Sequence, residues 1–184
     1  MNRKQFLKMS ACGGALPIFG QTAPDQAKGT PCAKRMEFSE TWVKRFMDVL
    51  GQNLDQETFK KIMEANGRAC FRGAHGEPKG NPAPDALEKF IERYNTYEAN
   101  AVYREDNVIH YKYIGNPQGL KVSGGHCLCP LAETVPKGIS GMYCHCSVGY
   151  VGEMFRGFLG RPVRVELVDS LLRGGKECRF KIYT

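Results

Sequence analysis

The sequence has no apolar run of about 18 residues, the length that a transmembrane helix needs. It also has no basic block, because beyond residue 23 the lysines and arginines are mixed with aspartates and glutamates. We therefore expect neither a transmembrane segment nor a nucleic acid partner. Internal repeats and low-complexity tracts are absent as well. What remains is a chain of 184 residues, 42% of them hydrophobic, which is enough for one domain with a real core.

The first 23 residues are predicted to be a signal peptide. They begin with three basic residues and no acid, continue with a mildly apolar stretch, and end in Gln21-Thr22-Ala23, which suits cleavage. Removing them lowers the formal net charge from +7 to +4. The stretch Asn2–Lys8 resembles a twin-arginine export signal, although Lys4 stands where the second arginine belongs. The resemblance implies recognition by the export machinery and a periplasmic or secreted protein; a general secretory signal or an ordinary basic terminus are the alternatives.

The next part of the chain is predicted to be helical. Residues 24–36 are polar and contain Pro, Gly and Asp, so we interpret them as a linker to a single domain over residues 37–184. Apolar residues at helical spacing predict a helix around Trp42–Leu50. They predict a second helix from Asp55, its N-cap, to Gly67, and a third from Asp85 to Tyr94, within a helical part that ends near residue 98.

Beyond residue 98 the apolar period changes to two, which is typical of strands. A hairpin is predicted over Ala101–Ile114, and a second from residues 163–168 and 177–182. Between them, apolar residues at helical spacing predict a helix that ends at Gly160. The expected fold class is therefore α+β, with N-terminal helices packed on an antiparallel sheet built from two β-hairpins with an intervening helix.

The densest chemistry lies in two short stretches. Four of the eight cysteines and two of the four histidines occur there, namely His126, Cys127, Cys129, Cys144, His145 and Cys146. Thiolate and imidazole are ligands of zinc and other soft metals. In an extended segment residues i and i+2 point to one face, which would put the sulfurs of Cys127 and Cys129 on the same side. In a helix the side chains of residues i and i+2 point roughly 200° apart. Cys144 and Cys146 could therefore share a ligand only if they lie before the helix or at its first turn.

Several interpretations of these cysteines stay open. One is zinc held by Cys127, Cys129, Cys144 and Cys146; an iron–sulfur cluster would use the same thiolates. Disulfides between the two stretches, a reactive thiol and inert buried cysteines are the others. His126 and His145 are weaker candidate ligands. Cys70 is either a fifth member of the site or a small buried hydrophobe, and Cys178, which alternates with Phe180 and Ile182, is expected in the core.

The last third of the chain carries a resemblance to known families. The order hairpin, cysteine segment, helix and hairpin, closed by Leu172–Ile182 with its Gly174-Gly175 and Cys178-x-Phe180, resembles the 4-vinyl reductase-like ligand-binding domain. It is equally similar to the L-2-amino-thiazoline-4-carboxylic acid hydrolase-like family, over residues 100–184. The resemblance implies a sheet packed on helices around a small-molecule pocket. It also implies a structural zinc held by cysteines near this helix, which would correspond to Cys144 and Cys146.

These observations lead to two functional expectations. The first is an exported, cysteine-rich, metal-binding domain with a small-molecule ligand. The alternative, implied by the hydrolase resemblance, is a cysteine hydrolase that acts on a small cyclic amide-like or thiazoline carboxylate. Its nucleophile would be Cys144, because a helix N-terminus lowers the pKa of a thiol. His126 or His145 would be the base, and Arg68 would hold the carboxylate of the substrate.

Overall fold

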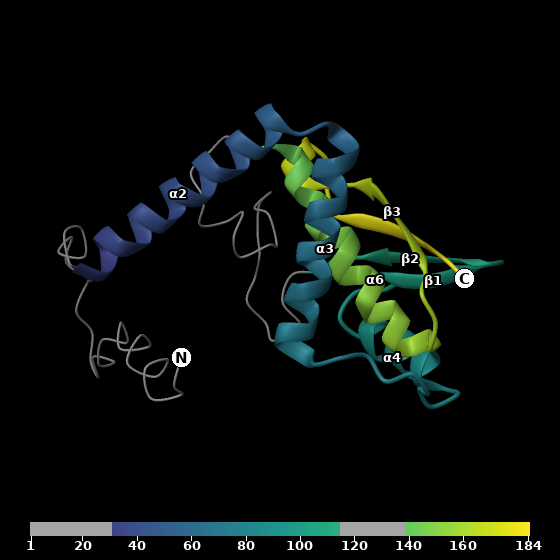
Figure 1. Cartoon of the computed structure of the whole chain (residues 1–184). Coiled ribbons are helices and arrows are strands. Elements are labelled where there is room, and N and C mark those ends of the chain that lie inside the picture. Colours follow the sequence, from purple (N-terminus) through teal and green to yellow (C-terminus); the bar gives the residue numbers. More distant parts are fainter. Residues whose placement is uncertain (1–30, 115–138) are drawn as a thin grey trace, which may run out of the picture. The chain divides into compact units, whose positions relative to one another are not determined.

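The computed structural model describes residues 31–114 and 139–184 (Figure 1). The chain divides into two units after residue 43, so the described part of the first unit is residues 31–43. The boundary between the units falls inside helix α2 (Pro31–Asn53). Residues 1–23 lie outside the described part, so export stays a prediction. The same holds for His126, Cys127 and Cys129. Within the described residues, no helix is both long and apolar enough to cross a membrane.

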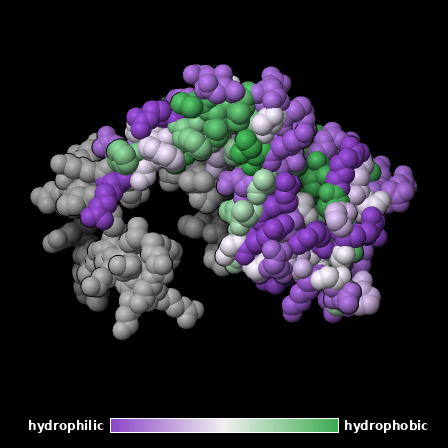
Figure 2. Space-filling view, viewed as in Figure 1, coloured by the Kyte–Doolittle hydropathy of each residue, from purple (hydrophilic) through white to green (hydrophobic). Residues whose placement is uncertain are grey.

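Helix α2 begins at Pro31, inside the segment that the sequence suggests is a linker. Proline is favoured in a first helical turn, because the N–H group that it lacks would have no partner there. The residues at positions 33–37 are all good helix formers, so this stretch forms a helix despite its polar composition. Hydrophobic side chains are visible along α2 (Figure 2), and four of the large ones are exposed: Phe38, Trp42, Phe46 and Val49.

Helix α3 spans Gln56–His75 and begins at the predicted cap. Asp55 Oδ1 accepts a hydrogen bond from the backbone N–H of Thr58 at 2.9 Å. The predicted end at Gly67 is wrong, because the helix continues to His75 and ends at Gly76, whose φ is 80°. A glycine within a helix marks a place of close packing as often as an end. Helix α4 spans Ala86–Asn95, as expected.

The sheet contains both predicted hairpins. Strands β1 (Val102–Glu105) and β2 (Val108–Lys112) form the first, and β3 (Arg164–Asp169) and β4 (Arg179–Tyr183) form the second. The strand order is β1-β2-β4-β3, and all neighbours are antiparallel. The pairing of β2 with β4 joins the hairpins into one sheet. The α+β fold, with a helix between the two hairpins, is confirmed.

The intervening helix α6 spans His145–Leu159 and carries the core of the domain. It follows a short 3₁₀ helix, η2 (Gly141–Cys144), and ends at Gly160, whose φ of 69° favours glycine. Six side chains with at most 1% exposure join α6 and the sheet in one core: Val102, Ile109, Val151, Phe155, Phe180 and Ile182. Cys178 is buried in the same cluster, which confirms its predicted place in the core.

Helices α3 and α6 touch backbone to backbone. A Cβ atom on Gly67 would lie 1.8 Å from the carbonyl oxygen of Cys146, and one on Gly149 would lie 1.9 Å from that of Glu64. Neither position has room for a methyl group. We call this contact the glycine seam. It explains why Gly67 lies within a helix, since a larger residue there would push α6 away.

The glycine seam gives a first prediction. Replacing Gly67 or Gly149 by Ala should lower the free energy of unfolding by about 1–3 kcal/mol, since the helices must separate to admit a methyl group. The matched control is Gly73→Ala in α3, where a Cβ would meet nothing within 4 Å. That change should leave stability equal or raise it by up to about 1 kcal/mol through helix propensity. Urea denaturation followed by circular dichroism measures all three; equal effects at the three positions would contradict a tight seam.

Candidate functional site

The main hollow of the described residues is a cleft of about 640 Å³ between α3, α6 and β3. Side chains at helical spacing line it from α3: Glu57, Lys60, Lys61, Glu64 and Arg68. From α6 come His145, Val148, Gly149, Gly152, Glu153 and Arg156, and residues 162–167 form the wall on the β3 side. Glycines 149 and 152 contribute no side chain, which leaves the space open. A volume of this size is common for small-molecule sites.

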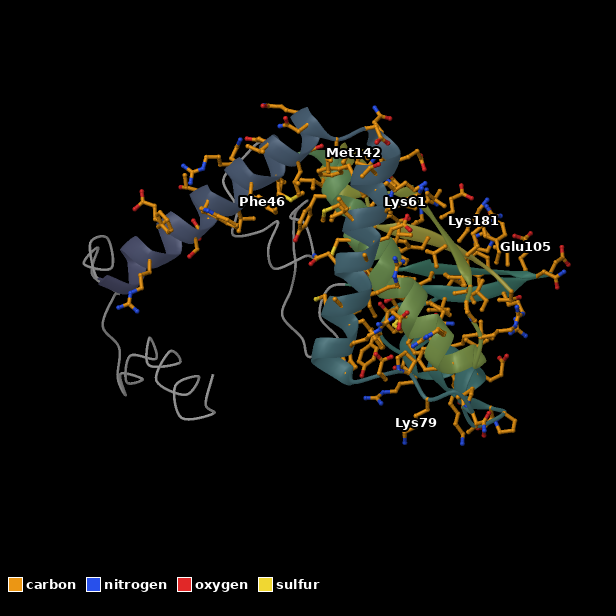
Figure 3. All side chains as sticks on the ribbon, viewed as in Figure 1. Phe46, Lys61, Lys79, Glu105, Met142 and Lys181 are labelled. Atoms are coloured by element: carbon orange, nitrogen blue, oxygen red, sulfur yellow. The ribbon has the colours of Figure 1, made fainter. Side chains whose placement is uncertain are left out.

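The charges in the cleft are not all paired. Arg68 lies 4.0 Å from Glu64, its neighbour one turn earlier on α3. Lys60 and Lys61 form no ion pair with any residue in the described part of the chain. Figure 3 shows Lys61 on the surface of α3. The α3 wall therefore offers two ammonium groups that an anion could bind.

His145, the first residue of α6, also lines the cleft. Its side chain is 16% exposed, and its Nδ1 atom lies 4.0 Å from Glu64 Oε1 with no hydrogen bond to any described residue. Burial lowers the pKa of His145, and the positive charges of Lys60 and Arg173 lower it further, against the opposing effect of Glu64. The imidazole is therefore neutral at neutral pH and can accept a proton or a hydrogen bond.

Glu153 and Arg156 of the cleft belong to a group of four charged residues with Arg72 and Glu77, which we call the Glu153 cluster. Glu153 is buried, with 4% exposure, and accepts hydrogen bonds from Arg72 Nε at 3.1 Å and Arg72 Nη2 at 3.3 Å. Arg156 Nη2 lies 3.1 Å from Glu153 and 3.1 Å from Glu77, which also pairs with Arg72 at 3.4 Å. The cluster ties the end of α3 and the segment after it to α6.

The two cysteines at the start of α6 lie in different surroundings. Cys144 is buried at the end of η2 and borders a small cavity of about 10 Å³, together with Cys178, Tyr113 and Ser147. The sulfur of Cys146 instead accepts a hydrogen bond from Asn66 Nδ2 on α3, at 3.5 Å. The i, i+2 spacing in a helical turn separates the side chains by roughly 200°. Cys144 and Cys146 therefore have different neighbours among the described residues.

Cys70 lies on the same side of the glycine seam as Cys146. It is exposed, one turn beyond Asn66 on α3, and its charge helps to raise the pKa of Tyr150 after the larger effect of burial. Tyr150 is one turn beyond Cys146 on α6. The side chains of Asn66, Cys70, Cys146 and Tyr150 do not line the cleft. In residues 31–114 and 139–184, no group of three or more His, Cys, Asp or Glu side chains is arranged to hold a metal ion.

Of the site residues predicted from the sequence, Arg68 and His145 lie in the cleft, whereas Cys70, Cys144 and Cys146 do not. The sequence alone did not indicate Lys60 and Lys61 of α3 or Glu153 of α6 as site residues. One signal was available: Glu153 stands between Val151 and Met154 in an otherwise apolar helix, and a charge there needs a partner when buried. Arg156, three residues later, is one such partner.

Residues 21–184 match the model of a family of unknown function (DUF6144). No curated protein matches the chain. The family match begins near the predicted cleavage site and includes the whole described part of the chain.

The ion pairs of the Glu153 cluster predict that removing the single charge of Glu153 lowers the stability of the protein. Glu153→Gln should lower the free energy of unfolding by about 2 kcal/mol. Removing one partner of a buried ion pair costs about 3–5 kcal/mol, and the 40% exposure of the Arg72 side chain reduces this. The control is Glu88→Gln, which breaks the exposed pair with Arg104 and should change stability by less than about 1 kcal/mol. Chemical denaturation of both variants checks this, and a Glu153→Gln protein as stable as Glu88→Gln would refute the structural role.

Proposed function

The chain belongs to DUF6144, a family of unknown function, and we propose that its cleft between α3, α6 and β3 binds a small carboxylate. The observation that carries this proposal is the pair of unpaired ammonium groups, Lys60 and Lys61, on one wall of a cleft of about 640 Å³. The α3 wall carries three positive and two negative side chains, so a bound carboxylate would balance its charge.

The local electrostatics support an anion over a cation. The pKa of His145 is lowered by burial first, and then by the positive charges of Lys60 and Arg173. Of the acids that line the cleft, Glu153 pairs with two arginines, Glu166 accepts a hydrogen bond from the hydroxyl of Tyr183, and Glu64 lies 4.0 Å from both Arg68 and His145. Among the described residues only Glu57 has no such contact to set against Lys60 and Lys61. An incoming carboxylate therefore meets more available positive than negative charge.

The opposite wall supports a ligand with an apolar part. Half-buried aliphatic side chains of β3 and the residue before it, Val163, Val165 and Leu167, face the cleft beside Val148 of α6. These aliphatic side chains alternate with Arg164 and Glu166 on the β3 side of the cleft, which offers an apolar surface opposite the charges of α3. The ligand class that fits both walls is a small carboxylate with an aliphatic or cyclic body.

The geometry favours binding over the thiol-hydrolase hypothesis. Cys144, the predicted nucleophile, borders the small cavity beside the sheet, whereas His145, one of the two predicted bases, lines the cleft. The other predicted base, His126, lies outside the described residues. A nucleophile and its base must come within hydrogen-bond reach of one another. Arg68 keeps its proposed role, because it lines the cleft and can reach the same carboxylate as the two lysines.

The test uses hexanoate as the probe and hexanamide, its neutral analogue, as the control ligand. Hexanoate should bind to the full chain by calorimetry, and hexanamide should bind more weakly. The double change Lys60→Gln with Lys61→Gln should weaken hexanoate binding roughly 5- to 30-fold, because each exposed ion pair contributes up to about 1 kcal/mol.

The control is Lys181→Gln on β4 (labelled in Figure 3), which removes one positive charge at a position that alternates with the buried Phe180 and Ile182. It should leave binding unchanged. Equal binding of hexanoate and hexanamide, or equal losses in the cleft and control variants, would rule out the charged site. If hexanoate does not bind to the wild-type chain at all, the proposal of an aliphatic carboxylate is wrong.

A second candidate function is metal binding on the other side of the glycine seam. The supporting observation is that Cys70 and Cys146, far apart in sequence, lie on neighbouring turns of α3 and α6. We propose that they bind zinc together with Cys127 and Cys129, which lie outside the described residues. This set exchanges Cys144 for Cys70, since Cys144 lies beside the core. Four thiolates would make a closed structural site.

Elemental analysis of the full chain, purified without oxygen, tests this set. Wild-type protein and Cys144→Ser should contain one zinc per chain, whereas Cys146→Ser and Cys70→Ser should lose it. Loss of zinc in Cys144→Ser with retention in Cys70→Ser would instead favour the set predicted from sequence. Wild-type protein without stoichiometric metal would exclude both sets.

A further inference from the structure

Strand β3 lies at one edge of the sheet. It pairs with β4 only, and its other side pairs with no strand among the described residues. An edge strand presents a row of N–H and C=O groups that another chain can pair with. Its sequence, Arg164 to Asp169, contains no proline that would prevent pairing. We propose that β3 pairs antiparallel with β3 of a second copy of this chain, joining the two sheets across a twofold axis.

The bulge in β3 limits where such pairing can occur. The register of β3 against β4 shifts between Leu167 and Asp169, so the regular part of the strand ends at Leu167. Val163 directly precedes β3, and the stretch Val163–Leu167 has Val165 at its centre. A twofold axis at Val165 therefore uses the regular part of the strand and the residue before it.

Charge selects the same register. In such a twofold pair the helix-covered faces of both sheets lie on the same side of the joined sheet. Two residues directly opposite one another must therefore point to the same side. With the axis at Val165, Arg164 faces the partner's Glu166, and this ion pair occurs twice. With the axis at Glu166, two carboxylates would face each other, which is destabilising. The strand is thus complementary in charge to itself in one register.

The side chains that form these pairs are already ordered. The guanidinium of Arg164 lies 3.5 Å from the centre of the Tyr183 ring, and the hydroxyl of Tyr183 donates a hydrogen bond to Glu166. One tyrosine therefore holds both charges on the face of the sheet away from α6. Side chains fixed before association lose less entropy when they pair.

The other face of the paired strands would be apolar. Val163, Val165 and Leu167 are half-buried at the margin of the core. In the proposed register Val165 faces the partner's Val165, and Val163 faces the partner's Leu167. Pairing would bury the exposed remainder of all six side chains and extend the core across the axis. The inference uses one wall of the cleft but does not rest on the proposed ligand.

A charge exchange tests the register in the full chain. Sedimentation at micromolar concentrations should show a dimer for the wild type and a monomer for Glu166→Arg, in which Arg164 faces an arginine of the partner. Arg164→Glu should also be monomeric. The double variant Arg164→Glu with Glu166→Arg should restore the dimer, since the charges again oppose. A monomeric wild type, a dimer that survives both single changes, or a double variant that stays monomeric would each overturn the proposal.

A cysteine cross-link tests the same axis without altering charge. Residues directly opposite in an antiparallel pair lie at a Cα separation that a disulfide can span. Val165→Cys should therefore form a covalent dimer under mild oxidation, reversed by reductant, as seen on a non-reducing gel. The control Val163→Cys, which faces the partner's Leu167, should not do so above the background of the native cysteines. Equal cross-linking of the two variants would contradict an axis at Val165, even if a charge variant failed to fold.

Discussion

The contact of α3 with α6 through Gly67 and Gly149 determines most of what the domain presents to its surroundings. Because the backbones touch, the side chains of both helices are forced to the two sides of the seam. One side becomes the charged cleft with β3, and the other carries Cys70 and Cys146. The Glu153 cluster then fixes how the two helices end relative to one another. A single close approach thus sets the position of both candidate sites.

Much of the fold could be predicted from local patterns. Alternation of apolar residues identified both hairpins, and the Asp55 cap and Gly160 stop marked true helix ends. The errors in the predicted helix bounds came from residue types that have two common structural roles. Gly67 suggests a helix end by composition but is needed for backbone contact, and Pro31 suggests a linker but suits a first helical turn. Which use applies depends on contacts between segments distant in sequence.

The candidate sites were harder to predict than the fold. The dense cysteine pairs drew attention, yet the helical turn at Cys144 and Cys146 sends their side chains to different surroundings. The cleft is formed by residues from three separate elements, and no local pattern tells which flank of α3 will face β3. Arg68 and His145 were identified by residue type, whereas the role of Lys60 and Lys61 depends on their forming no ion pair with the described residues of the folded chain. That information exists only after folding.

The segment between α3 and α4 has a consequence for how the protein withstands degradation. Residues 76–84 are rich in proline and glycine and have no helix or strand of their own, which in many proteins marks a site of proteolytic cleavage. Here Glu77 is bound by Arg72 and Arg156, and a Cβ on Gly160 would lie only 2.9 Å from the carbonyl oxygen of Gly80. A protease must pull its substrate into an extended form. This segment is attached near its start and its middle to the buried helix of the core, so cutting it requires that the end of α6 first come apart.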